Sequence, residues 1–146
     1  MLALGYTNRA MGEPSRSMPP AYPTYDQTVS FHHALMARLG LGESSVANEA
    51  KLRAALDRTL QAAQGQRGDL VMLTAFLLFN LIREKPFVKG NAETGVALAL
   101  AFLLRNGGMA MAPDEEVAGV GIGVLEGGVY VGMVEQWLRD SVRRMA

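Results

Sequence analysis

The chain has 146 residues, a length typical of one domain with a sizeable core. Hydrophobic residues make up 49% of it and charged residues 19%, which excludes an intrinsically disordered protein. Its 14 basic and 14 acidic residues cancel, so the net charge gives no reason to expect nucleic acid as a partner. The absence of cysteine excludes disulfides, thiolate metal sites and a cysteine nucleophile.

The first 24 residues differ in composition from the rest of the chain. They contain four of the six prolines, together with glycines and serines that favour turns. We therefore expect an extended N-terminal arm over residues 1–24, followed by one helical domain over residues 25–146. We favour a loosely packed tail, and the alternative is an arm pinned to the domain by apolar and aromatic residues, namely Met1, Leu2, Leu4, Tyr6, Tyr22 and Tyr25. No secretory leader is recognisable, and we expect a cytoplasmic protein.

Helical spacing of apolar residues recurs along the domain. It predicts helices over residues 27–39, 48–63, 70–83, 91–105 and 130–145. The helices 70–83 and 91–105 are apolar on nearly every face, so we expect them to be the most buried. Neither approaches the ~20 apolar residues that a membrane span needs, and we expect no membrane partner. Five glycines in residues 117–128 leave two alternatives there, a strained helix or a partial strand.

Two adjacent histidines lie in the first predicted helix. Neighbouring helical side chains point about 100° apart, so His32 and His33 cannot both face one metal ion. No Asp, Glu or Cys accompanies them at ligand spacing. We therefore expect one to pack inside and the other to meet solvent, and we expect no metal site.

The two apolar helices are joined by the sequence KPFVKGN, residues 85–91. Pro86 ends the preceding helix, and Gly90 permits backbone geometry that other residues resist. Asn91 is a suitable N-cap for the next helix. Because the first amides of a helix have no intrahelical acceptor, this helix start is a candidate anion site.

This segment resembles the signature of the Fic/Doc family, His-Pro-Phe-x-Asp/Glu-Gly-Asn-x-Arg, with weaker similarity over about 120 residues. The signature's scaffold positions are kept: Pro86, Phe87, Gly90, Asn91 and Thr94. The apolar helix also ends in Arg-Asn-Gly, as in Doc-type members. The resemblance implies an all-α fold, a helical bundle around a central buried helix. A different helical fold that shares KPFVKGN by chance is the alternative.

The chemical positions of the signature are changed. Lys85 stands where the family has its catalytic His, Lys89 where it has an acidic metal ligand, and Glu93 where it has a phosphate-binding Arg. The resemblance implies that this His accepts a proton from a target hydroxyl, which attacks a nucleotide phosphate held with a divalent metal. A lysine charged at neutral pH cannot accept that proton, and it cannot ligate magnesium.

Three functions remain open. We favour a Doc-like protein of toxin–antitoxin type that has lost standard transferase catalysis and acts as a binding or regulatory module with an antitoxin-like protein or peptide. Its residual anion site would comprise Lys89, Gly90, Asn91 and Glu93, with ATP or another nucleotide as ligand. The second function is an AMP- or phosphate-transferase acting on protein hydroxyls, with Lys85 as an altered catalytic residue. The third is a structural homo-oligomer built through the C-terminal helices.

Overall fold

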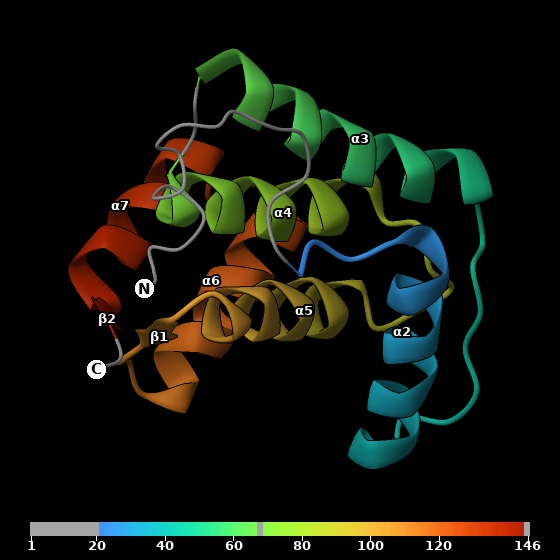
Figure 1. Cartoon of the computed structure of the whole chain (residues 1–146). Helices are drawn as coiled ribbons and strands as arrows, with labels where there is room; N and C mark the ends of the chain where they lie inside the picture. Colours follow the sequence, from blue (N-terminus) through green and yellow to red (C-terminus); the bar gives the residue numbers. More distant parts are fainter. Residues whose placement is uncertain (1–20, 67–68, 145–146) are drawn as a thin grey trace.

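The computed structural model describes residues 21–66 and 69–144. Its helices are α2 (Tyr25–Leu39), α3 (Glu49–Gln66), α4 (Leu70–Glu84), α5 (Asn91–Arg105), α6 (Asp114–Glu126) and α7 (Val131–Ser141). Two short antiparallel strands accompany them, β1 (Gly108–Ala110) and β2 (Val142–Arg144) (Figure 1). The predicted all-α class is confirmed. In these two stretches of chain no helix has the length and hydropathy needed to cross a membrane.

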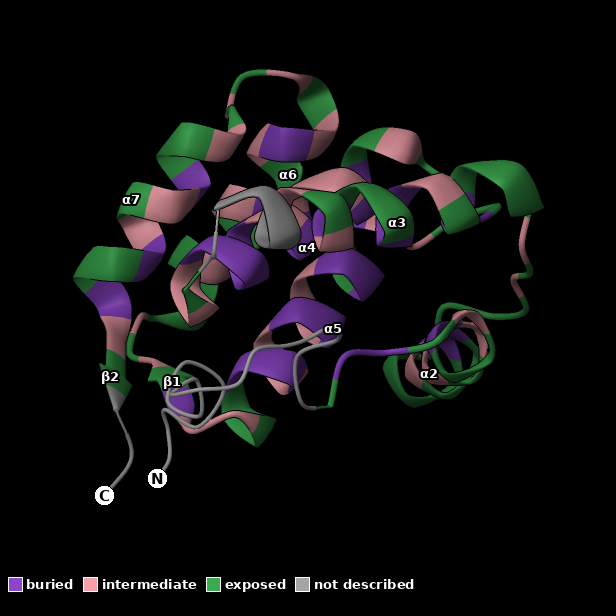
Figure 2. Ribbon diagram, turned by 45° about the horizontal axis from the view of Figure 1, so that its top comes forward, coloured by how far each residue is buried: buried purple, intermediate pink, exposed green. Residues whose placement is uncertain are grey.

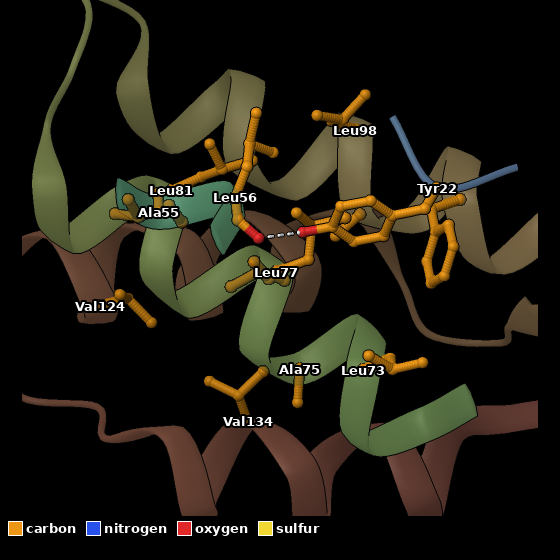
Figure 3. Close-up of a cluster of buried hydrophobic side chains, with 14 of the residues drawn as sticks. Tyr22, Ala55, Leu56, Leu73, Ala75, Leu77, Leu81, Leu98, Val124 and Val134 are labelled. Atoms are coloured by element: carbon orange, nitrogen blue, oxygen red, sulfur yellow. Dashed lines mark hydrogen bonds between the residues drawn. The ribbon is translucent and has the colours of Figure 1, made fainter. Parts of the chain in front are cut away.

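Helix α4 forms the centre of the domain. It lies between α3 and α5, and it also packs against α6 and α7 (Figure 1). Eight of its 15 residues are buried, and seven of the 15 in α5, so the two helices expected to be most buried are the observed ones (Figure 2). In the core, Leu77 and Leu81 of α4 are surrounded by side chains from α3, α5, α6 and α7 (Figure 3). Burial of this apolar surface is the main term that stabilises the fold.

Glycines allow α4, α5 and α6 to approach closely. A Cβ atom on Gly95 of α5 would lie 2.5 Å from Cγ1 of Ile82 on α4. A Cβ atom on Gly121 of α6 would lie 2.8 Å from Cγ2 of Val96 on α5. Residues 117–128 are therefore mostly helical despite their low helix propensity, because close packing on α5 offsets it.

The C-terminal end of the domain corrects one prediction. A helix was expected over residues 130–145, but α7 ends at Ser141 and the backbone of Val142 is extended. Residues 142–144 pair with β1, and Met111 donates its N–H to the Ser141 carbonyl. This pairing joins segments far apart in the sequence, so helical periodicity alone could not reveal it.

The predicted N-terminal arm falls largely outside the described residues. Of its last four residues, Tyr22 is buried, and its hydroxyl donates to the Leu56 carbonyl of α3 over 2.7 Å (Figure 3). Its ring packs edge-on against Phe102 of α5. Burial raises the pKa of the Tyr22 phenol. Tyr22 therefore pins residues 21–24 to the core, which agrees with the alternative for this short part of the predicted arm.

Candidate functional site

Residues 85–90, which we call the signature loop, leave the central helix abruptly. Lys85 is the C-cap of α4, with φ 50° in the left-handed region, and its N–H donates to the Ile82 carbonyl. Pro86 disfavours the right-handed helical region for the residue before it, which explains why α4 stops here. The Lys85 side chain is exposed, whereas Pro86 and Phe87 are buried. The loop is therefore anchored by its apolar residues and displays its charged ones.

Asn91 closes the loop rather than capping the next helix. Its side-chain oxygen accepts from the Phe87 N–H over 2.9 Å, and its amide nitrogen donates to the Phe87 carbonyl over 3.0 Å. The N-cap of α5 is Gly90, with φ 73°, so the prediction that Asn91 is the N-cap is wrong. The physical reason is competition: both polar atoms of the Asn91 side chain already bond to the loop backbone. The backbone N–H of Asn91 is one of the first-turn amides of α5 that have no intrahelical acceptor.

The extended segment between α2 and α3 runs beside the signature loop. The N–H groups of Ala47 and Asn48 both donate to the Pro86 carbonyl, over 2.7 and 3.1 Å. Val88 in turn donates its N–H to the Ser45 carbonyl over 2.9 Å. The Asn48 side chain then accepts from a first-turn amide of α3, the Lys51 N–H. The loop is thus held by strand-like backbone bonds on this side.

Helix α2 supplies the wall on the other side of the loop. The His32 ring stacks on Phe87 with centroids 3.8 Å apart and planes 9° from parallel. A Cβ atom on Gly90 would lie 2.5 Å from Sδ of Met36, one turn further along α2. This contact and the positive φ both explain why glycine occupies position 90.

One histidine is buried and the other exposed, as predicted. His32 has no solvent-accessible surface, and burial lowers its pKa to about 4, with a smaller contribution from the neighbouring His33. His32 is therefore neutral at pH 7. The sequence alone does not place His32 beneath the signature loop. Its helical spacing indicated packing, but no local signal identified its partners.

The charged residues of the signature all face solvent. Lys85, Lys89 and Glu93 are exposed, and Glu93 lies in the first turn of α5. The Lys89 ammonium lies near Gly42, where an added Cβ would come within 3.2 Å of it. The structure thus brings Lys89, Gly90 and Glu93 to the start of α5, with Lys85 at the other end of the loop.

The start of α5 has the features of an anion site. No side chain from residues 21–66 or 69–144 caps it. The first backbone hydrogen bond of the helix runs from the Thr94 N–H to the Gly90 carbonyl. The preceding first-turn amides carry the positive end of the helix dipole. Lys89 adds a positive charge nearby, whereas Glu93 opposes a bound anion.

A divalent metal does not fit this site. The signature position for an acidic ligand holds Lys89, whose ammonium group cannot coordinate Mg²⁺. Within the described part of the chain, no three His, Asp or Glu side chains are grouped so that they could hold a metal ion. No step that depends on a metal ion can be built from these residues.

An open groove of about 630 Å³ lies along the C-terminal half of α2 and the segment that follows it. Its lining residues are His33, Met36, Ala37, Gly40, Gly42, Glu43 and Ser44. Met36 and Ser44 also contact the signature loop, so the groove and the loop share a wall. Large apolar side chains are exposed in the adjoining segments, among them Leu41 and Val88.

Comparison with known protein families gives one match. The model described as the Fic/DOC family matches residues 7–103, a range that includes α2, the signature loop and most of α5. No curated protein matches the chain.

Proposed function

The chain belongs to the Fic/DOC family, and we propose that it is a binding or regulatory module of toxin–antitoxin type that no longer carries out the family's transfer reaction. The observation that carries this proposal is the environment of the signature residues. The uncapped start of α5 and the adjacent Lys89 offer a site for an anion. The position of the family's catalytic His and the position of its acidic metal ligand are both occupied by lysine, Lys85 and Lys89.

The geometry supports weak binding of a phosphate group. The first-turn amides of α5 would donate to the phosphate oxygens, and Lys89 would contribute as a point charge. Glu93 lies within the same turn, so its carboxylate competes for the positive end of the helix. A free phosphate or the phosphates of a nucleotide such as ATP are the ligands that this chemistry would recognise.

The groove beside the loop is the candidate place for an antitoxin-like protein or peptide. Met36 and Ala37 provide an apolar floor, and the exposed Leu41 and Val88 lie on segments next to it. Apolar side chains of a partner would be removed from water on binding there. Because the groove and the anion site share Met36 and Ser44 as neighbours, a bound partner would influence the loop.

The loss of transfer chemistry is tested with the native chain, ATP, magnesium and candidate protein targets. We expect no incorporation of AMP or phosphate above background. Lys85→His, Lys89→Asp and Glu93→Arg introduced together are the variant with which activity can return. Each change alone should remain inactive, because groups that act as a unit fail together. Robust transfer by the native chain would instead favour an active AMP- or phosphate-transferase with altered catalytic residues.

The anion site is tested by titration calorimetry with phosphate and with ATP. Glu93→Gln should bind a few-fold more tightly than the native chain, because a first-turn charge contributes ~0.3–1 kcal/mol. Lys89→Ala should bind more weakly. Lys51→Ala is the matched control, since Lys51 is exposed on α3 and is the only lysine outside the signature loop. If neither the native chain nor Glu93→Gln binds, the proposed anion site is wrong.

A further inference from the structure

His32 contacts three segments that meet at the signature loop, two through hydrogen bonds and one through ring stacking. Its Nδ1 lies 2.7 Å from the Thr94 hydroxyl on α5, and its Nε2 lies 2.9 Å from the Ser44 hydroxyl in the segment after α2. The ring itself stacks on Phe87 of the loop. A buried polar side chain costs free energy unless its polar atoms are paired. Here both ring nitrogens are paired, so His32 links these segments without leaving a polar atom unsatisfied.

The Ser44 hydroxyl, which is hydrogen-bonded to His32, is also hydrogen-bonded to the backbone of the signature loop. It donates to the Lys89 carbonyl and accepts from the Lys89 N–H, both over 3.3 Å. A serine hydroxyl has one proton, so if that proton goes to Lys89, Nε2 of His32 must be the donor to Ser44. Nδ1 is then the acceptor of the Thr94 hydroxyl proton. One neutral tautomer of His32 therefore satisfies the whole chain of bonds.

Lys89 is the last residue before the N-cap of α5. The strand-like bonds of the 44–48 segment reach only as far as Val88. Beyond it, the backbone of Lys89 is bonded to Ser44, and Gly90 packs on His32 and Met36. The positions of the first amides of α5 therefore depend on this contact with α2.

We propose that His32 is a positioning residue for the anion site: through Ser44 it holds the backbone of Lys89, and through Thr94 it fixes that backbone relative to α5. This inference rests on the proposed anion-binding function. His32 itself is buried and does not touch the anion. Its role is to keep the first-turn amides in the arrangement that binds phosphate, which a loop free to shift would lose.

The test removes the link at Ser44 and leaves the core intact. Inorganic phosphate affinity is measured by calorimetry on the full chain, and hydrogen exchange of the Phe87 amide is measured by NMR. Phe87 donates to Asn91 rather than to Ser44, so its exchange reports the position of the loop. Ser44→Ala removes the hydrogen bonds of the Ser44 hydroxyl to His32 and to both backbone groups of Lys89. The Kd for phosphate and the exchange rate should each rise at least three- to tenfold, which is about the effect expected for a single lost hydrogen bond. Ser44→Thr should restore both values because it restores the hydroxyl.

Ser45→Ala is the matched control. It makes the same chemical change on the neighbouring exposed residue, whose bond to the loop uses its backbone carbonyl. It should leave both readouts unchanged. His32→Phe keeps an aromatic ring on Phe87 but removes both hydrogen bonds, so it should show at least the effect of Ser44→Ala. If His32→Phe does not fold, the two serine variants still decide the question.

The two possible failures are distinguishable. If Ser44→Ala and Ser45→Ala have the same Phe87 exchange rate, His32 does not position the loop, whatever the phosphate affinity. If the exchange rates differ as expected but the native chain binds no phosphate, the anion site is wrong. The coupling of His32 to the loop then stands without that function.

Discussion

Helix α4 and the signature loop that follows it are stabilised by different forces. Apolar side chains of α4 are buried against four other helices, and burial of that surface holds it in place. The loop buries only Pro86 and Phe87, and hydrogen bonds from the 44–48 segment, Asn91 and Ser44 fix its backbone. The stability of the core therefore depends on how well its apolar side chains fill the available space, whereas the conformation of the loop depends on individual hydrogen bonds.

The difference supports the proposal that the reactive positions of the family signature were replaced while the fold was kept. The retained positions Phe87 and Thr94 are buried, and Gly90 fills a space against α2 that a larger residue could not. The changed positions Lys85 and Glu93 are exposed. Substitutions at exposed positions usually have small effects on stability, so the chemistry of the site could be replaced while the scaffold remained.

The largest effect is expected in the core. Leu77→Ala should lower the free energy of unfolding by about 2–5 kcal/mol, because Leu77 is completely buried and the change leaves a cavity. Val88→Ala, at an exposed loop position, should change it by less than about 0.5 kcal/mol. Urea denaturation of both variants measures the two values. Equal changes in the free energy of unfolding for the two variants would contradict the idea that the core and the loop are stabilised by different forces.

The next effect concerns pH and the buried histidine. The pKa of His32 is about 4 in the folded protein and ordinarily 6.5, so the unfolded chain binds more protons between these values. The stability due to neutral His32 is complete above pH 6.5 and is lost as the pH falls towards 4. The full loss is on the order of 3 kcal/mol.

Urea denaturation of the native chain at pH 7, 6 and 5 measures the part of this loss that falls above pH 5, roughly 2 kcal/mol. His32→Phe supplies the control, since without the imidazole the decline over this range should be smaller by the same amount. An identical decline in both proteins would show that His32 is not the titrating group.

A smaller effect is expected where helices approach at glycine. Gly95→Ala should cost about 1–3 kcal/mol, because the new methyl group would collide with Ile82 on α4. Gly119→Ala on α6 is the matched control, since nothing lies within 4 Å of its added Cβ. It should stabilise the protein by roughly 0.5–1 kcal/mol through helix propensity. Thermal unfolding of the two variants should therefore shift in opposite directions.

The smallest effect is expected at the changed signature positions. Lys85→His should alter the free energy of unfolding by no more than about 0.5 kcal/mol, because the side chain is exposed. Glu93→Gln should alter it by no more than about 1 kcal/mol, because it also removes a first-turn charge from α5. Denaturation curves that nearly overlay the native one would agree with the separation of chemistry from scaffold. A large loss of stability in either variant would show that these residues belong to the scaffold after all.

Sequence analysis predicted several elements well because their signals are local. The apolar periodicity of α4 and α5 identified the most buried helices. Pro86 and Gly90 marked the signature loop, since their backbone preferences act within one or two residues. The hydrogen-bond partners of the polar side chains at the site were harder to predict from the sequence. Asn91 was expected to cap α5, but its side chain bonds to Phe87 instead.

The sequence by itself determined the helical class and the two central helices. Each of these follows from residue type or from spacing within a few turns. Only the tertiary structure decided that His32 bonds to Thr94, 62 residues away, and that residues 142–144 leave the helix to pair with β1. Such contacts depend on which segments the packed core brings together, and local periodicity carries no information about distant partners.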